Sequence, residues 1–495
     1  MTFSSIVFVF AFLPIALAGY YLLRSNLKNA FLVLISLLFY ACGEPKFVLV
    51  LMADILLNYG FGLAIEEFRT KPIVTRSLMI IILSGNIGML LSYKYLYSAV
   101  SSFNQIANTS FSVPNLALPL GISFFTFRTI SYILDVYWGT SKAQENILSL
   151  ALYISFFPQI TSGPIVKYNN FENQIAVRTW NLELFVTGIK RLIIGLSKKV
   201  LIADMIAVCA DRAFGLANGE LSFSFAWLGA ITFLLQLYYD FSGYSDMAIG
   251  LGNMFGFNCP ENFDYPFISK SVGEYWRRWH ITLGAWLKDY IYTPVFRSMM
   301  KKKNIFTKQT MKINECDLFA LFITWLICGP WHGSGWTYLA YGMWYFVFIA
   351  LERLLQAREK KRLKLKKLPK PKEKKWVNFC SHIFTMLIVI FGTVIFRSNS
   401  IHSAITYMQA MLGLSAGSFV DSVFTFFLNE NKILYFVGII FCIPTARKVK
   451  EICNKYMILS RISYILSPII YMGLFFVAIS FTVTSSYSPF IYFKF

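Results

Sequence analysis

Runs of about twenty apolar residues follow one another along nearly the whole of this 495-residue chain. Hydrophobic residues make up 56% of the sequence and charged residues only 14%, whereas soluble domains carry roughly 25% charged residues. Too few polar residues are present to cover several soluble cores, so we predict that lipid surrounds the protein. The runs lie near residues 4–23, 28–65, 76–100, 115–137, 145–166, 183–212, 222–256, 317–353, 377–397, 400–416, 430–446 and 464–485.

A helix needs about 20 apolar residues to cross a bilayer, and each run has about that length or, as in 28–65, room for two. Backbone inside lipid must satisfy its own hydrogen bonds, which favours helices over open strands. We therefore predict an all-α polytopic membrane protein with 11–13 membrane helices, some of them short or re-entrant. Residues 1–495 would form a single integral membrane domain with its core at about 115–350.

The net charge of +21 is concentrated in short segments between apolar runs. Twelve lysines and arginines lie between Arg353 and Lys375, and a second basic segment covers 298–312. Short basic loops mark the cytoplasmic side of a membrane protein and can meet anionic headgroups. We therefore expect loops 298–312 and 353–375 to be cytoplasmic, the partner to be the lipid bilayer, and no nucleic acid to bind. The eight cysteines are scattered, which predicts neither disulfides nor a metal site.

About 40 residues separate the two basic loops, enough for a membrane hairpin of two helices. The turn of that hairpin would hold Gly329-Pro330-Trp331-His332-Gly333-Ser334-Gly335-Trp336, where three glycines and a proline break the helix. Irregular backbone at membrane depth is tolerated only inside protein or along a water-filled cavity. His332 is therefore predicted to line an internal cavity far from the cytoplasmic surface.

His332 differs from the other histidines because Gly and Trp surround it in a broken apolar segment. One interpretation is a core histidine that donates to a backbone carbonyl. The other is a general base that activates a hydroxyl for attack on an ester or thioester. His382 and His402 lie near helix starts, where an interfacial position is expected.

A second cluster runs from Glu274 to His280 and contains Arg277, Arg278 and Trp279. One interpretation is an interfacial helix whose arginines face headgroups. The other is that His280 completes a catalytic site with His332, and the spacing alone favours neither. In the second case the arginines and Trp279, together with Trp331 and Trp336, would bind the substrate.

Asp240 and Asp246 lie within a membrane-length apolar run. Isolated carboxylates are expensive there and need partners. Pairing with Arg277 or Arg278 would make both aspartates structural. The sequence has no phosphate-binding loop, and Ser334, which stands in Gly-Ser-Gly, is not the centre of a Gly-x-Ser-x-Gly nucleophile motif.

Six ordered blocks form a recognisable set. They are Leu118–Phe127, Ser155–Gln159 with Gly163–Ile165, Gly195–Asp204, Asp240–Ala248, Trp276–Tyr290 and Trp331–Gly333. In this order they resemble the motifs of the membrane-bound O-acyltransferase family, in the bacterial branch that acetylates alginate or peptidoglycan or exports D-alanine. Arg128 stands where the first block of the family would have glutamine.

The resemblance implies helices ringed around a central funnel, with His332 and His280 at the two histidine positions of the family. It also implies acyl transfer from a cytoplasmic donor, acetyl-CoA or another thioester, with no bound cofactor. The C-terminal segment 489–495 is similar to a tyrosine motif of such systems, in which Tyr492 would accept the acyl group from His332-assisted attack. An aromatic membrane anchor is the alternative for Tyr492.

The function implied is acetyl transfer across the bacterial cytoplasmic (inner) membrane for O-acetylation of peptidoglycan or an exopolysaccharide such as alginate. An extracytoplasmic O-acetyltransferase of the esterase-like SGNH type would complete the reaction. D-alanyl transfer to teichoic acid is the alternative within the family. A non-catalytic transporter is the alternative from another class.

Overall fold

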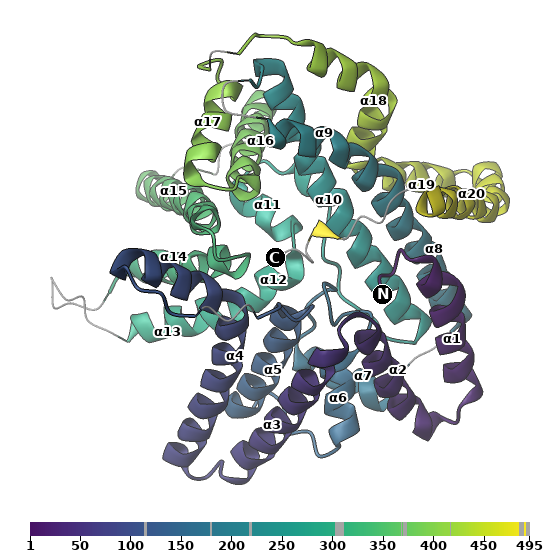
Figure 1. Cartoon of the computed structure of the whole chain (residues 1–495), viewed down its shortest axis with the longest axis vertical. Helices are drawn as coiled ribbons and strands as arrows, with labels where there is room; N and C mark the ends of the chain where they lie inside the picture. The colour runs from purple at the N-terminus through teal and green to yellow at the C-terminus, as the bar shows by residue number, and fades with distance from the viewer. Residues whose placement is uncertain are drawn as a thin grey trace. The chain divides into compact units, whose positions relative to one another are not determined.

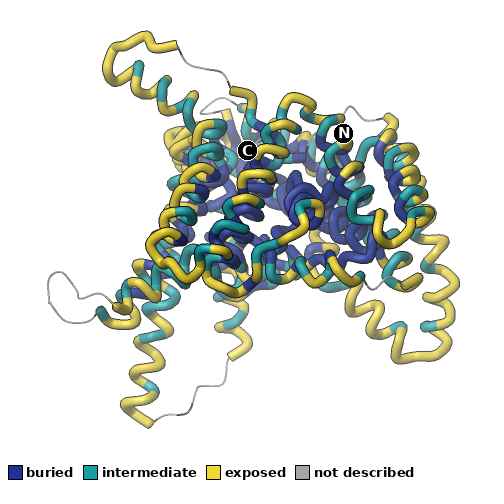
Figure 2. The backbone as a smooth tube through the Cα atoms, turned by 90° about the horizontal axis from the view of Figure 1, so that it is seen from below, coloured by how far each residue is buried: buried dark blue, intermediate teal, exposed yellow. Residues whose placement is uncertain are grey.

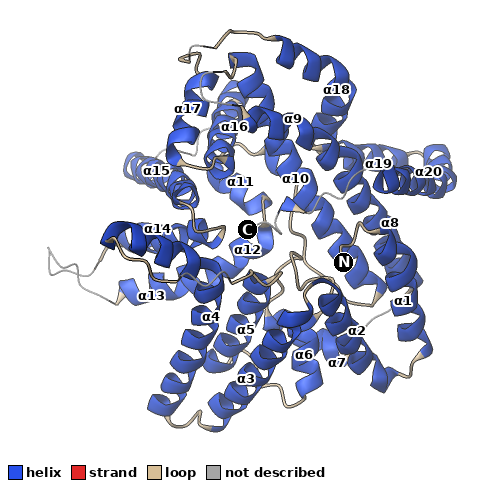
Figure 3. Cartoon of the chain, viewed as in Figure 1, coloured by secondary structure: helices blue, strands red, loops and turns tan. Residues whose placement is uncertain are grey.

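The computed structural model describes residues 1–112, 116–178, 181–216, 220–301, 311–367, 369, 374–415, 417–484 and 490–491. Within these residues every regular element is a helix, and Figure 3 accordingly shows no strand. Eight described helices are long and apolar enough to cross a membrane. The predicted all-α, multi-pass membrane fold is thereby confirmed.

Several predicted spans fold as shorter helices. Run 115–137 gives the 17-residue helix α5, run 145–166 the 9-residue α6, and run 400–416 the 11-residue α17. Every residue of α6 from Ser149 to Ser155 is buried. A helix that other protein segments cover does not have to span the lipid, so its length is free of the bilayer's constraint. The eight candidates are Ser25–Gly43, Pro45–Glu67, Pro72–Ala107, Ile313–Trp331, Trp336–Lys366, Lys375–Arg397, Ser422–Phe441 and Met457–Thr484.

The chain divides into two compact units, each built from separated segments. Unit 1 consists of Met1–Val200, Phe241–Glu261 and Ile470–Phe495, and unit 2 of Leu201–Asp240 and Asn262–Ile469. Two long helices, α10 (Phe223–Met254) and α20 (Met457–Thr484), contribute residues to both units.

Unit 1 contains the first eight helices, labelled in Figure 1. Helices α3, α4 and α5 contact one another as a group. A Cβ atom on Gly195 of α8 would lie 2.4 Å from the carbonyl oxygen of Gly243 in α10. The two backbones therefore touch, as small residues allow in membrane helix pairs. The helices are α1 Leu13–Leu22, α2 Lys28–Gly43, α3 Val48–Glu67, α4 Pro72–Ala107, α5 Ile122–Trp138, α6 Ile147–Ser155, α7 Tyr168–Ala176 and α8 Leu182–Ser197.

Unit 2 is organised around the hairpin of α14 and α15, which pack closely along each other, and α15 also contacts α16. A Cβ on Gly342 would lie 2.6 Å from the carbonyl oxygen of Trp325 and 2.9 Å from the Cα of Gly329. The helices lying wholly in unit 2 are α9 Asp204–Gly215, α11 Val272–Arg278, α12 Ile281–Leu287, α13 Thr293–Met300, α14 Ile313–Trp331, α15 Trp336–Lys366, α16 Lys375–Arg397, α17 Ile401–Met411, α18 Ser422–Phe441 and α19 Thr445–Lys455.

The hairpin between the basic segments was predicted, but its glycines act differently from the prediction. Gly329 and Pro330 lie inside the last turn of α14, which continues to Trp331. Gly329 does not break the helix. Because it has no side chain, α15 can pack directly against its backbone. The break comes afterwards, at His332–Gly335.

The prediction of a loop at 353–375 is wrong for its first part, because α15 continues through this basic segment to Lys366. Lysine, arginine, leucine and glutamate are good helix formers, and no glycine or proline interrupts the sequence before Pro369. Of the nine predicted loop residues 302–310, none belongs to the described part of the chain.

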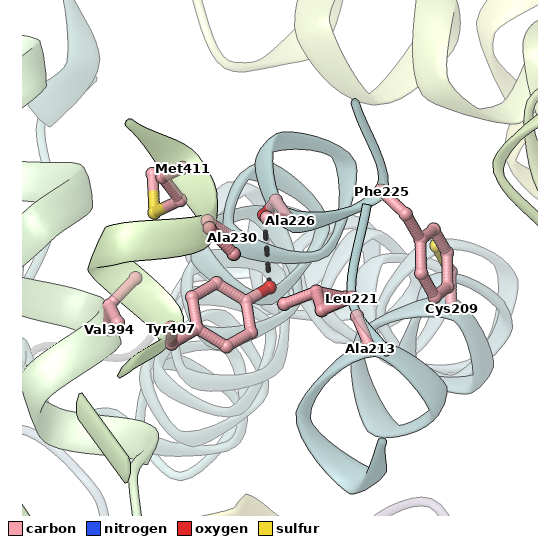
Figure 4. Close-up of a cluster of buried hydrophobic side chains, with 10 residues drawn as sticks. Cys209, Ala213, Leu221, Phe225, Ala226, Ala230, Val394, Tyr407 and Met411 are labelled. Carbon is pink, nitrogen blue, oxygen red and sulfur yellow. Dashed lines mark hydrogen bonds between the residues drawn. The ribbon is translucent and has the colours of Figure 1, made fainter. Parts of the chain in front are cut away.

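A cluster of buried side chains forms one core of unit 2, where α9, α10, α16 and α17 meet (Figure 4). The Tyr407 hydroxyl donates to the backbone oxygen of Ala226 at 2.9 Å across this core. In contrast, Ala478 is the only residue of α20 that is buried. Such helices appear in Figure 2 as stretches of exposed and intermediate backbone, as expected for segments that lipid surrounds.

Candidate active site

His332 lies in unit 2, immediately after α14, and its side chain is only 4% exposed. Its backbone N–H donates to the oxygen of Gly329 at 3.0 Å, and the N–H of Gly333 donates to Pro330 at 2.9 Å. These two bonds continue the helical turn past Pro330 and set the direction in which the imidazole leaves the backbone.

Four aromatic rings from three helices surround the imidazole, and the most distant is Tyr338 in α15 at 6.5 Å. The ring centroid of Trp331 lies 4.6 Å away, that of Phe396 at the end of α16 5.1 Å, and that of Tyr341 in α15 5.6 Å. Phe396 and Tyr341 meet it edge to face, at interplanar angles of 84° and 89°. The aromatic walls exclude water from most of the ring, so solvent would not compete with a bound hydroxyl for the imidazole.

His280 is buried, with 1% exposure, and stands at the start of α12 with a φ of 45°. This left-handed backbone is uncommon for a residue with a side chain. It is held by Asn262, whose backbone oxygen accepts from the N–H of Ile281 at 2.9 Å. The imidazole Nδ1 lies 3.1 Å from Asn262 Oδ1.

Asn262 determines which nitrogen of His280 carries the proton. Its Oδ1 accepts from the backbone N–H of Thr282 at 3.2 Å and from the Thr282 hydroxyl at 2.8 Å. A backbone N–H can only donate, so the amide atom facing His280 is the oxygen. Nδ1 must then donate its hydrogen to that oxygen, and the lone pair is on Nε2.

His280 lies outside the eight candidate membrane-spanning helices. Burial lowers the pKa of His280 to about 3, because the charged form loses its hydration. The imidazole is therefore neutral at physiological pH, and its unprotonated nitrogen can accept a proton or a hydrogen bond.

The two histidines adjoin the same indole. The centroid of Trp331 lies 6.1 Å from that of His280 and 4.6 Å from that of His332. The structure thus brings together three of the predicted site residues within unit 2. Among the described residues, no group of three histidine, cysteine or acidic side chains could hold a metal ion.

The remaining predicted substrate-binding residues occupy different surroundings. Trp279 stacks on Tyr275 with centroids 5.6 Å apart. Arg278 pairs with Glu274 and Asp264, each at 3.0 Å, and Arg277 is exposed. Trp336 is 77% exposed, so the structure does not place it against either imidazole.

Helix α11, which leads to His280, is anchored to α15 by Glu352. Its carboxylate accepts from the backbone N–H groups of Val272 at 2.5 Å and Gly273 at 2.9 Å. A carboxylate at a helix start satisfies free N–H groups and the positive end of the helix dipole. Since α15 also supplies Tyr341, one helix positions groups at both histidines.

Asp246 is ion-paired within unit 1, but with partners other than those predicted. Its carboxylate pairs with Arg191 Nε at 2.9 Å and Lys198 Nζ at 2.7 Å. Arg278 instead pairs with Glu274 and Asp264 in unit 2, so the predicted ion pair between Arg278 and Asp246 does not form. Asp240 is 2% exposed in the unit 2 part of α10.

Tyr492 lies outside the described residues. Phe490, two residues earlier, is buried in unit 1, with its ring edge-on to Tyr244 at 4.8 Å. The Lys199 ammonium lies 4.7 Å from the centroid of the Phe490 ring. Phe490 is therefore held in unit 1 by an aromatic and a cationic contact.

Sequence reasoning missed Asn262, Tyr341 and Phe396. Phe396 ends an apolar run and Tyr341 is one of many tyrosines, so neither has a distinguishing local pattern. Asn262 is a polar residue next to Pro260-Glu261, a signal that also suits an ordinary turn. His382 donates Nδ1–H to the oxygen of Ser269 at 2.9 Å, and His402 is exposed.

Comparison with known proteins places these residues in a wider set. The profile of the membrane-bound O-acyltransferase family matches residues 143–402. The chain is 38% identical to the probable alginate O-acetylase of Pseudomonas aeruginosa, over 83% of this chain and 75% of that protein. It is 32% identical to the peptidoglycan O-acetyltransferase of Helicobacter pylori, over 90% and 86% of the two chains. The teichoic acid D-alanyltransferase of Bacillus subtilis is 32% identical over 58% of this chain and 71% of its own.

Proposed function

Because the chain belongs to the membrane-bound O-acyltransferase family, we propose that it moves an acetyl group across the cytoplasmic (inner) membrane of a bacterium. The group would come from a cytoplasmic thioester, acetyl-CoA or another, and serve to O-acetylate peptidoglycan or an exopolysaccharide such as alginate. The observation that carries the proposal is the pair of buried imidazoles beside one indole at the hairpin turn.

His332 is the proposed general base. Its imidazole takes the proton from an acceptor hydroxyl, and the oxygen then attacks the thioester carbonyl carbon. The C–O bond forms, the C–S bond breaks, and the thiolate leaves with the proton that the imidazolium returns. His280 keeps its Nδ1–H on Asn262 and directs the lone pair of Nε2 to the reacting groups.

The first acceptor in this proposal is the hydroxyl of Tyr492, which would hold the acetyl group as an ester. What supports it is the similarity of segment 489–495 to the tyrosine motif of related systems. The tyrosyl ester would then pass the group to an extracytoplasmic esterase-like O-acetyltransferase of the SGNH type. A tail that serves only as an aromatic anchor is the alternative.

We prefer acetyl transfer over D-alanyl transfer because the O-acetylating relatives align with a larger share of this chain. The O-acetylating relatives align with 82–90% of this chain, and the D-alanyltransferases with 56–58%. Membership of an acyltransferase family also assigns chemistry to the chain, which a non-catalytic transporter would lack.

The test uses membranes from a deletion strain that expresses the full chain, supplied with acetyl-CoA labelled in the acetyl group. Label on the polymer is expected for the wild-type chain and for His402→Gln, a control in an exposed position. His332→Gln and Tyr492→Phe are expected to abolish it. Full labelling by His332→Gln would overturn the role of His332, and full labelling by Tyr492→Phe would leave the tail as an anchor. Labelling only from D-alanyl thioester would establish the alternative substrate.

A further inference from the structure

A cavity of about 70 Å³ lies in unit 2 where the ends of α9 and α16 meet α17. No residue of the proposed catalytic site lines it. One wall is aromatic, since Phe214 and Tyr407 stack with centroids 4.3 Å apart. Figure 4 shows Tyr407 with its hydroxyl turned to the Ala226 backbone. The polar lining residues besides Tyr407 are Arg397, Ser398, Asn399, Ser403, Thr406 and Ser415.

The position of the cavity follows from the length of α16. This helix has 23 residues from Lys375 to Arg397, or about 34 Å at 1.5 Å per residue, which matches the thickness of a bilayer core. It begins beside the basic segment that is expected in the cytoplasm. Its end is therefore at the opposite membrane face, and Phe396 contacts His332 there. The cavity belongs to the outer end of the helix, on the side of the catalytic histidine.

Two hydroxyl groups in the lining can act as acceptors. Ser398 donates its hydrogen to the backbone oxygen of Val394 at 2.7 Å, and Thr406 donates its hydrogen to the backbone oxygen of His402 at 3.0 Å. A hydroxyl has one hydrogen and two lone pairs. Once the hydrogen is committed to the helix backbone, only lone pairs remain for a bound molecule. A ligand must therefore bring hydrogens of its own, as a sugar hydroxyl does.

Arg397 supplies hydrogen-bond donors to the same cavity. Its Nη2 pairs with Asp211 at 2.8 Å, and its guanidinium lies 5.8 Å from the centroid of Phe214. A guanidinium has five N–H donors, and the bond to Asp211 uses one of them. The others suit ring, hydroxyl or carboxylate oxygens of a ligand.

We propose that this cavity is a saccharide subsite, which takes the edge of one sugar unit of the polymer. The proposal rests on the proposed function and deepens it by naming a direct contact with the polymer that finally receives the acetyl group. Acceptor oxygens, an arginine and an aromatic face in one cavity match a molecule with hydroxyls, oxygens and a C–H face. A volume of about 70 Å³, against the roughly 10–15 Å³ of cavity volume that one water molecule needs, admits part of a sugar ring. The rest of the polymer stays outside.

The test measures binding to the purified full chain in nanodiscs by isothermal titration calorimetry. The two probes are a mannuronate tetrasaccharide and the N-acetylglucosamine disaccharide, which share hydroxyls and differ in carboxylates. Saturable binding of at least one is expected. Arg397→Gln should raise its Kd about tenfold, since a hydrogen bond to a charged group is lost. Asp211→Asn, which breaks the same ion pair but keeps the guanidinium, should change Kd less than twofold.

Thr406→Val keeps the shape of the side chain and removes its lone pairs, so a Kd about threefold to tenfold higher is expected. Thr425→Val is the matched control, because Thr425 makes the same bond to the carbonyl four residues earlier, at 3.0 Å, in α18. The proposal is overturned if neither probe binds saturably, or if Arg397→Gln and Thr406→Val bind like their controls.

Failure of this subsite and failure of the proposed function give different results. His332→Gln should bind the saccharide with unchanged Kd, because it does not line the cavity. A wild-type chain that transfers labelled acetyl groups but binds neither probe would remove the subsite and leave the function. A chain that binds a probe but transfers no acetyl group would do the reverse.

Discussion

The protein buries two polar clusters that are opposite in character. In unit 1, Asp246 is ion-paired with Arg191 and Lys198, whose side chains are 26% and 24% exposed. In unit 2, His280 and His332 are buried among aromatic rings, with Asn262 holding the first. One cluster is made of charges and the other is built around imidazoles.

The difference shows how a low-dielectric interior separates structure from chemistry. A buried carboxylate must be neutralised by cations, and those bonds commit its oxygens. A neutral imidazole can be buried with a single hydrogen bond and still present a lone pair. We infer that the ion-paired cluster supports the fold and the histidine cluster supports the reaction.

The largest expected effect separates these roles through activity. His332→Ala should lower acyl transfer by about 10²–10⁴-fold, the usual contribution of a general base, while thermal unfolding of the purified chain stays near that of the wild type. Added free imidazole should restore part of the rate by occupying the vacated space. A variant that loses activity only because it no longer folds would show no rescue and would place His332 with the structural cluster.

Asp246→Ala should act mainly on stability. Removing the carboxylate takes a shared partner from two partly buried cations, although Arg191 keeps its pair with Glu261, so a loss of about 1–3 kcal/mol of unfolding free energy is expected. Asp211→Asn is the control, because its pair with Arg397 is 35% and 61% exposed and should contribute less than about 1 kcal/mol. Denaturant unfolding in detergent measures both. Equal losses for the two variants would contradict the distinction.

The pH dependence of stability tests the neutral state of His280. Its folded pKa of about 3 is below the unfolded value of about 6.5, so only the unfolded chain takes up the proton between these values. Stability is therefore complete above about pH 6.5 and falls as the pH is lowered. From pH 6.5 to 5 the loss attributable to this residue should be about 2 kcal/mol, at about 1.4 kcal/mol per pH unit. His280→Asn should remove this part of the decline, and an unchanged decline would show that His280 is charged in the folded state.

The smallest effect is expected at Trp336, the exposed first residue of α15. Trp336→Leu should change stability by less than about 0.5 kcal/mol, as for exposed positions, and leave transfer close to wild type. Trp331→Leu, the buried counterpart five positions earlier, should lower both because it removes the indole that adjoins both imidazoles. Labelling assays and unfolding curves of the two variants provide the comparison. A large loss at Trp336 would extend the substrate site to the exposed end of α15.

The sequence by itself determined the helical membrane fold, the α14–α15 hairpin and the place of His332 at its turn. Hydrophobic run length and loop charge are local properties, and lipid leaves few ways to satisfy them. It also singled out His280 as a candidate, although the spacing left an interfacial helix equally open.

Only the tertiary structure decided which partners these residues have. Asp246 contacts Arg191 from a helix 55 residues away in the sequence, and His280 is oriented by Asn262 from a loop. Phe396 reaches His332 because α16 returns along the hairpin. Such contacts depend on how helices pack, and packing is set by the shapes of many side chains at once, including glycines whose missing Cβ allows two backbones to touch.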